Sequence, residues 1–254
     1  MIAVNELRSA TKDLIKRLLE RSPYRVIRAR VRNRFFAQQE TLTVLARRGY
    51  QPRRIVDGGA HVGDFARMAR SVFADAVMDL IEPQAACQAA LHDLAVSMPG
   101  CVLHPVAIGR APGTLTMACN PTAPSTGAHI QPDTDNYSDT TQAVTVATLD
   151  SILAGIGRED RTLLKLDLQG WELEALQGAV AALTAIEVIL IEVSFYAQAY
   201  EPPIATLIAF LSDYGFVLHD IATLVGRQRD DRAHQADFLF VRSGSPLDAD
   251  RSWD

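Results

Sequence analysis

Cysteine is scarce in this chain of 254 residues, which has only Cys87, Cys101 and Cys119. None of them belongs to a C-x-x-C pair. An odd number without that spacing provides neither a disulfide framework nor a zinc site, so we expect reduced thiols. The spacing of possible ligands elsewhere does not suggest a metal site either, and we expect none.

Long apolar runs are also lacking. The sequence has no segment near the roughly 18 uninterrupted apolar residues that a membrane span needs, so no span is expected. The first eight residues already carry charges where a signal peptide would have its apolar stretch, and Glu6, Asp13 and Glu20 are unusual in a transit peptide. These observations predict a cytoplasmic protein.

Charge is unevenly distributed. Residues 1–54 hold 14 Lys and Arg against 4 Asp and Glu, whereas the remaining residues hold 11 against 26. A basic arm could bind an acidic partner, a membrane surface or nucleic acid, or it could pack on the acidic body of its own or a neighbouring chain. Apolar residues at helical spacing between Leu7 and Leu19 favour packing, because such a stripe needs covering. We therefore expect no nucleic-acid partner, and a possible homo-oligomer through the arm.

Strands and helices alternate along the rest of the chain. Apolar runs predict strands at 54–57, 76–81, 101–108, 143–147, 163–167, 186–193, 215–219 and 237–241. Helical patterns lie between them, and a further helix is predicted in the arm between Phe35 and Leu45. This alternation predicts an α/β fold with a doubly wound, mainly parallel sheet. We expect a basic helical arm over 1–50, the α/β domain over 51–242 and a polar, frayed tail over 243–254.

A glycine-rich turn, Asp57-Gly58-Gly59-Ala60-His61-Val62-Gly63, follows the first predicted strand and opens a helix. Glycines there let the backbone lie against a ligand, and Glu82, at the end of the next strand, is placed to bind ribose hydroxyls. The turn can also be aligned with the dinucleotide fingerprint G-x-G/A-x-x-G, which leaves a nicotinamide oxidoreductase as an alternative. Asp57 weighs against it, because a carboxylate repels a pyrophosphate and attracts an ammonium or a sulfonium. A non-catalytic cofactor-binding scaffold is a third alternative.

A second motif is Leu164-Lys165-Leu166-Asp167-Leu168-Gln169-Gly170-Trp171-Glu172. Asp167 stands where a strand gives way to a helix, so its carboxylate should emerge at the same sheet edge as Asp57 and Glu82. Carboxylates that converge in this way repel one another unless a cation lies between them. Asp167 could instead cap the following helix.

Several motifs in order resemble the FkbM-type methyltransferases over roughly residues 50 to 242. These are Asp57-x-Gly59-Ala60-x-x-Gly63, Glu82-Pro83, Pro105-Val106-Ala107-Ile108-Gly109, Thr148-Leu149-Asp150, Lys165-x-Asp167-x-Gln169-Gly170-x-Glu172, and Ile191-Glu192-Val193 followed by Gly215-Phe216. The resemblance implies a Rossmann-like fold of the class I methyltransferase type with an antiparallel last strand. It also implies S-adenosylmethionine as the cofactor, and O-methylation of a hydroxyl on a small natural product, a sugar or a glycan.

The resemblance further implies a set of cofactor-binding residues. Glu82 would hold the ribose, Ala107 would lie near the adenine, and Asp167 would face the sulfonium or the acceptor. The full expected set is Asp57, Gly59, Ala60, His61, Gly63, Phe65, Glu82, Pro83, Ala107, Ser125 and Asp167. The chain departs from the family at His61, where the family usually has Asn.

A hydroxyl acceptor needs a base within about 3 Å of its proton. The candidates at the strand ends are Asp167, Glu192 and His61. An aromatic wall for the acceptor could come from Trp171, Phe195, Tyr196 and Tyr200.

Overall fold

The computed structural model describes residues 34–120, 122–131, 140–196, 201–227, 229–230 and 232–249, which all belong to one compact unit that begins at Arg34. The basic helix predicted between Leu7 and Leu19 lies outside the described residues. Helix α2 (Arg34–Arg47), which the sequence analysis placed in the arm, belongs to this unit and packs against helix α3 and strand β10. No helix in the described part of the chain is long and apolar enough to cross a membrane.

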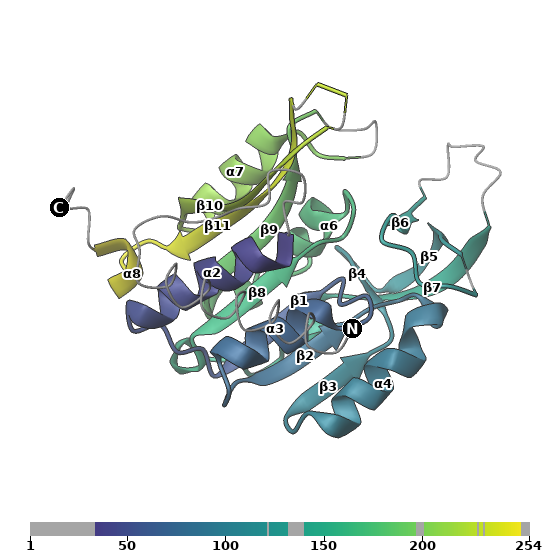
Figure 1. Cartoon of the computed structure of the whole chain (residues 1–254), viewed down its shortest axis with the longest axis horizontal. Coiled ribbons are helices and arrows are strands. Elements are labelled where there is room, and N and C mark those ends of the chain that lie inside the picture. Colours follow the sequence, from purple (N-terminus) through teal and green to yellow (C-terminus); the bar gives the residue numbers. More distant parts are fainter. Residues whose placement is uncertain are drawn as a thin grey trace, which may run out of the picture. The chain divides into compact units, whose positions relative to one another are not determined.

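A seven-stranded sheet forms the centre of the unit, with the strand order β10-β11-β9-β8-β1-β2-β3 (Figure 1). Its strands are β1 (Arg54–Gly58), β2 (Val77–Ile81), β3 (Cys101–His104), β8 (Thr162–Leu166), β9 (Ile186–Ser194), β10 (Phe216–Gly226) and β11 (Ala233–Arg242). Strands β3, β2, β1, β8 and β9 are parallel, whereas β11 runs antiparallel to both β9 and β10. The predicted doubly wound sheet with an antiparallel last strand is confirmed.

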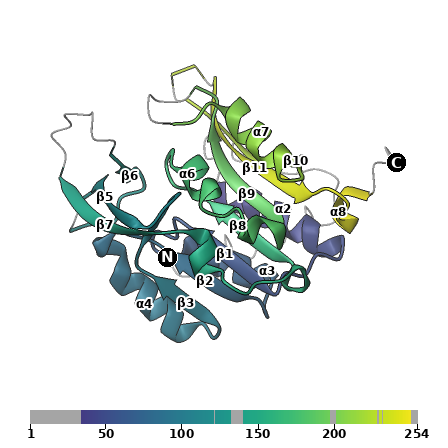
Figure 2. The same ribbon diagram turned by 180° about the vertical axis from the view of Figure 1, so that it is seen from behind.

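Helices cover both faces of this sheet, as Figures 1 and 2 show from opposite sides. On one face α2, α3 (Asp64–Val72) and α4 (Gln88–Ser97) pack against side chains such as Ile55 and Leu163. On the other face α5 (Leu149–Ile152), α6 (Glu172–Gln177) and α7 (Ile204–Asp213) pack against the neighbouring residues Val56 and Leu164. Successive strand residues thus enter two different cores, which explains why the parallel strands are apolar almost throughout. Short 3-10 turns stand at η1 (Ala85–Cys87), η2 (Arg158–Asp160) and η3 (Ala182–Thr184).

A second, four-stranded sheet lies between β3 and α5 in the sequence, with the order β4-β7-β5-β6. It consists of β4 (Ala107–Ile108), β5 (Gly113–Ala118), β6 (His129–Ile130) and β7 (Thr141–Ala147). The single strand predicted over 101–108 is therefore wrong, since it is divided between the two sheets at Pro105. Proline has no N–H to donate to a strand ladder, and the chain leaves the first sheet there.

The end of the described chain is also more ordered than the sequence suggested. The predicted frayed tail contains helix α8 (Pro246–Ala249), whose Leu247 side chain is 1% exposed. The guanidinium of Arg48, just after α2, donates to the Leu247 carbonyl oxygen at 2.9 Å. A helix of four residues has too short an apolar pattern to be recognised in a sequence.

Candidate cofactor site

The glycine-rich turn leaves β1 at the C-terminal edge of the main sheet. Gly59 has φ of +76°, and a Cβ there would lie 2.0 Å from the carbonyl oxygen of Asp167, so the position requires glycine. Gly63, with φ of +87°, is fixed for a different reason, because a Cβ would lie 2.3 Å from a methyl group of Leu94. Gly59 lines the cavity that follows, whereas Gly63 packs on α4.

Asp57 lies beneath this turn and pairs with Lys165. The two residues are opposite each other on β1 and β8, are 1% and 5% exposed, and their Oδ1 and Nζ atoms are 3.0 Å apart. The same ammonium donates to the carbonyl oxygens of Gly58 and Gly59, at 3.3 and 2.9 Å. Burial raises the pKa of Asp57, and the charge of Lys165 opposes that rise. Asp57 was expected to attract a positively charged group of the ligand, but in the structure Lys165 takes that place and Asp57 does not line the cavity.

Glu82 follows β2 and is held in one orientation by two backbone groups. Its Oε2 accepts from the N–H of His61 at 2.8 Å, and its Oε1 accepts from the N–H of Gln84 at 2.9 Å. The residue is 3% exposed but lines the cavity. A carboxylate fixed in this way can accept hydrogen bonds from a ribose diol through its remaining lone pairs.

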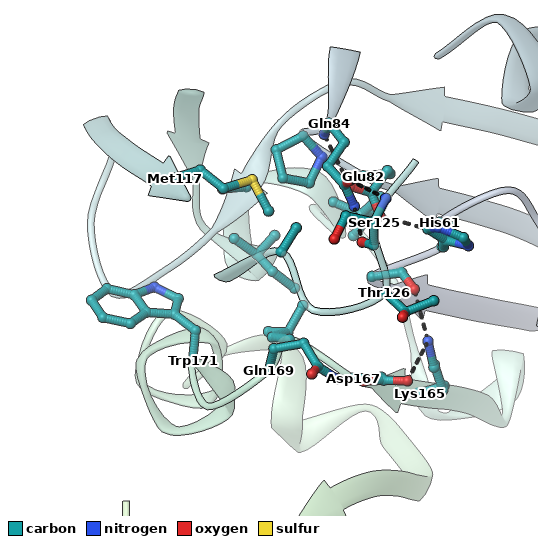
Figure 3. Close-up of a pocket in the computed structure, with 18 of the residues that line it drawn as sticks. His61, Glu82, Gln84, Met117, Ser125, Thr126, Lys165, Asp167, Gln169 and Trp171 are labelled. Carbon is teal, nitrogen blue, oxygen red and sulfur yellow. Dashed lines mark hydrogen bonds and ion pairs between the residues drawn. The ribbon is translucent and has the colours of Figure 1, made fainter. Parts of the chain in front are cut away.

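Asp167 stands at the end of β8, where its side chain reaches the cavity wall (Figure 3). Its Oδ1 accepts from the amide of Gln169 at 2.8 Å, and its Oδ2 lies 3.9 Å from Nζ of Lys165. Lys165 is therefore the cation that lies between Asp57 and Asp167. The converging carboxylates predicted a cation between them without naming it, and a lysine inside the apolar run of β8 was the signal in the sequence that could have identified it.

Glu192 lies behind Gln169 and does not reach the cavity. The amide of Gln169 that bonds Asp167 also donates to Oε1 of Glu192 at 3.0 Å, and Gln235 donates to the same oxygen at 3.1 Å. Glu192 is 6% exposed and does not line the cavity. Gln169, whose backbone has the left-handed φ of 54°, links Glu192 to Asp167.

The second sheet supplies one side of the cavity. We call Met117, Ser125, Thr126, Ala128 and Ile130 the roof, since they come from β5, β6 and the loop between them and line the cavity from this side. The cavity has a volume of about 280 Å³. In Figure 3 its two ends differ: Met117 and Trp171 lie at one end, and Lys165 and His61 at the other. The apolar end suits a nucleobase, and the charged end suits an amino-acid moiety.

Of the eleven expected cofactor-binding residues, the structure brings nine to the cavity wall: Gly59, Ala60, His61, Phe65, Glu82, Pro83, Ala107, Ser125 and Asp167. The other two, Asp57 and Gly63, lie behind the wall. The wall also contains residues that the expected cofactor set omits: Gln38, Asp64, Ile81, Gln84, Val106, Ile108, Met117, Thr126, Ala128, Ile130, Lys165, Leu168, Gln169 and Trp171.

The aromatic wall expected for the acceptor does not form as a unit. Trp171 packs with the second sheet, whereas Phe195 packs edge-on against Phe238 and Tyr196 stacks on His234. Tyr200 lies outside the described residues. Trp171 thus belongs to the apolar end of the cavity.

The donor set of the cavity fits S-adenosylmethionine. His61 Nε2 and Trp171 Nε1 are buried in the wall without a hydrogen-bond partner among the described residues, and polar atoms of a bound cofactor can satisfy them. Glu82 offers acceptors beside His61, and Ile108 and Met117 offer apolar wall. Grouped His, Cys, Asp and Glu side chains that could hold a metal do not occur in the described ranges.

Comparison with known proteins identifies the family. The family model described as the methyltransferase FkbM domain matches residues 57–218, so the chain belongs to that family. Its members are S-adenosylmethionine-dependent methyltransferases, which confirms the class and the cofactor that the sequence predicted. A search of curated protein sequences gives no match.

Similar solved structures include a precorrin-6y C5,15-methyltransferase from Geobacter metallireducens, with 12% identity and a TM-score of 0.43 over 87% of this chain and 95% of that one. An rRNA methylase from Streptococcus thermophilus has 9% identity and a TM-score of 0.45, over 85% and 99%. TYW2 from M. jannaschii, solved with AdoMet, has 11% identity and a TM-score of 0.42, over 85% and 79%. At these values they say nothing about the acceptor of this chain.

Proposed function

We propose that this methyltransferase methylates a hydroxyl oxygen on a small natural product, a sugar or a glycan. The observation that carries the proposal is the Asp167 carboxylate, which lies on the cavity wall and is oriented by Gln169. When bound, S-adenosylmethionine supplies a methyl group that a positively charged sulfur activates for in-line displacement. A hydroxyl acceptor then needs a group that removes its proton, and Asp167 is suited to that task.

The other two candidate bases are less well placed. Glu192 is separated from the cavity by Gln169, so we assign it a positioning role on the Asp167 side of the site. His61 lines the cavity, but its backbone N–H is bound to Glu82, which places it with the cofactor-binding residues. We therefore propose Asp167 as the base, with the Lys165 ammonium 3.9 Å from its Oδ2 atom.

A small acceptor is also favoured over nucleic acid by charge. Residues 55–254 hold 11 Lys and Arg against 26 Asp and Glu, an excess of negative charge that disfavours a phosphate backbone, whereas the excess of positive charge lies in residues 1–54. Cytoplasmic location and assembly through the N-terminal arm stay predictions from the sequence.

The test is a screen with methyl-labelled S-adenosylmethionine against hydroxylated metabolites, glycans, amines, tRNA and rRNA. We expect label in a hydroxylated compound, with the methyl group located on oxygen by NMR. Transfer to nitrogen or to RNA would contradict the proposal, and binding of cofactor without any transfer would favour the scaffold alternative.

The role of Asp167 is tested in the same assay. Asp167→Asn should lower kcat by about 10²–10⁴-fold, because the amide cannot accept the proton, while binding of S-adenosylhomocysteine changes little. Glu174→Gln is the matched control, since Glu174 lies nearby on α6 but pairs with Arg110 outside the cavity. An Asp167→Asn variant as active as this control would exclude Asp167 as the base.

A further inference from the structure

Two glutamine side chains join the segment that follows β2 to the second sheet. The amide of Gln84 donates to the carbonyl oxygen of Ser125 at 3.1 Å and accepts from the N–H of Ser125 at 3.0 Å (Figure 3). The amide of Gln142, on β7, donates to the carbonyl oxygen of Pro83 at 3.0 Å and accepts from the N–H of Ala85 at 3.1 Å. Each side-chain amide thus donates one hydrogen bond to the backbone and accepts one from it, as a residue of a paired strand does. We call Gln84 and Gln142 the glutamine clamp.

Gln84 is the more deeply placed of the two and is itself firmly held. It is 4% exposed, its backbone N–H donates to Oε1 of Glu82, and its carbonyl oxygen accepts from the amide of Gln88 at 3.0 Å. The residue that bonds the roof therefore also orients the carboxylate proposed to hold the ribose. Cofactor binding at Glu82 and the position of the roof are linked through one residue.

Within the second sheet, Met117 is held by the ladder between β5 and β7, and Ala128 and Ile130 pack in its apolar core, whereas Ser125 and Thr126 belong to no strand. Strand β6 consists of two residues, and its ladder with β5 pairs only Met117 with Ile130 and Ala118 with His129. Ser125 lies in the loop between these strands and lines the cavity together with Thr126. The bonds from Gln84 fix this loop against the main sheet at the point where it covers the cavity.

We infer that Gln84 is a positioning residue that holds the roof closed over the cofactor and so sets how long the cofactor stays bound. It acts through the backbone of Ser125. On this inference, movement of the roof limits the exchange of product for fresh cofactor, as lid movements limit turnover in many enzymes. The inference concerns cofactor retention and does not depend on which acceptor is methylated.

The first experiment measures dissociation. The protein is loaded with labelled S-adenosylmethionine and chased with excess unlabelled S-adenosylhomocysteine. Gln84→Leu keeps the size of the side chain and removes both bonds, so we expect release about tenfold faster or more. Gln39→Leu is the matched control, because it removes the bond from Gln39 to Ser71, which lies outside the cavity wall. Its release rate should equal that of the unmodified chain.

A second measurement needs no ligand. Amide hydrogen exchange in the free protein should become faster over residues 122–130 in Gln84→Leu, while β1, β8 and β9 keep their protection. Gln84→Met, which removes both bonds without adding a charge, should show the same effect and replaces Gln84→Leu if that variant does not fold. Release and roof exchange that match the Gln39→Leu control would overturn the inference, and so would faster exchange across the whole unit.

Discussion

At the scale of single residues, Asp57 and Lys165 form a buried ion pair beneath the glycine-rich turn. Lys165→Met leaves the Asp57 carboxylate buried without its cation, so we expect a loss of about 3–5 kcal/mol in the free energy of unfolding at pH 7. The double variant with Asp57→Asn removes both charges and should lose less. Urea denaturation of the single and double variants measures both losses. An equal or greater loss in the double variant would show that the unpaired Asp57 carboxylate is not what destabilises the single variant.

Glu172 gives a second prediction, on pH dependence. Burial raises its pKa from 4.5 to about 7, although the N–H groups of Leu168 and Gly170 donate to it. Between these pH values the folded protein holds a proton that the unfolded chain has released. The contribution of Glu172 to stability is therefore fully present below about pH 4.5 and is lost as the pH rises through 7.

Glu172→Gln cannot titrate, but it retains an oxygen for the same backbone groups. In the unmodified protein, the free energy of unfolding should decrease by up to about 3 kcal/mol as the pH rises from 4.5 through 7. The Glu172→Gln variant should not show this decrease. Denaturation curves at several pH values between 4.5 and 8 measure the difference. Parallel stability profiles for the two proteins would contradict the assignment.

Prediction of individual residues from the sequence succeeds where a residue's role follows from its place at a strand end. Glu82 and Asp167 were found in this way, and both line the cavity. Lys165 and Gln84 were missed, because their roles depend on partners 108 and 41 positions away in the sequence, Asp57 and Ser125. Neither partner can be recognised before the strands are paired.

For whole elements, helix α8 provides the clearest prediction. Leu247 is 1% exposed and packs in the same core as Leu42 and Leu45 of α2. Leu247→Ala should lower the free energy of unfolding by about 2–5 kcal/mol. Leu218→Ala on β10 is the control, since Leu218 is 44% exposed and should matter much less. Equal effects of the two variants would mean that the C-terminal residues are frayed, as the sequence suggested.

The strands of the main sheet were predictable because apolar runs bounded by glycine or proline mark parallel strands buried on both faces. The division of residues 101–108 was not, since β4 pairs with β7 some forty residues later. The end of the strand predicted at 215–219 was placed too early. Asp220, which pairs with Leu239, interrupts the apolar run while β10 continues to Gly226.

At the scale of the whole molecule, the site is assembled from the ends of several parallel strands and is closed by the second sheet. The order of the strands and their motifs in the sequence identified this arrangement as a methyltransferase fold. The second sheet was predicted only in part: the family resemblance placed Ala107 and Ser125 at the cofactor, but the segment over 118–141 has no periodicity from which β6 could be recognised. Gln38 on α2 was missed for a similar reason, since its position at the cavity depends on a bond to Asp237 on β11.

The central claim is that the cavity binds S-adenosylmethionine and its product. Calorimetric titration of the purified full chain with S-adenosylhomocysteine, and separately with NAD and NADP, tests it most directly. We predict micromolar binding of S-adenosylhomocysteine and no binding of either nicotinamide dinucleotide. Binding of NAD or NADP alone would contradict the account and would restore the oxidoreductase alternative on the same fold.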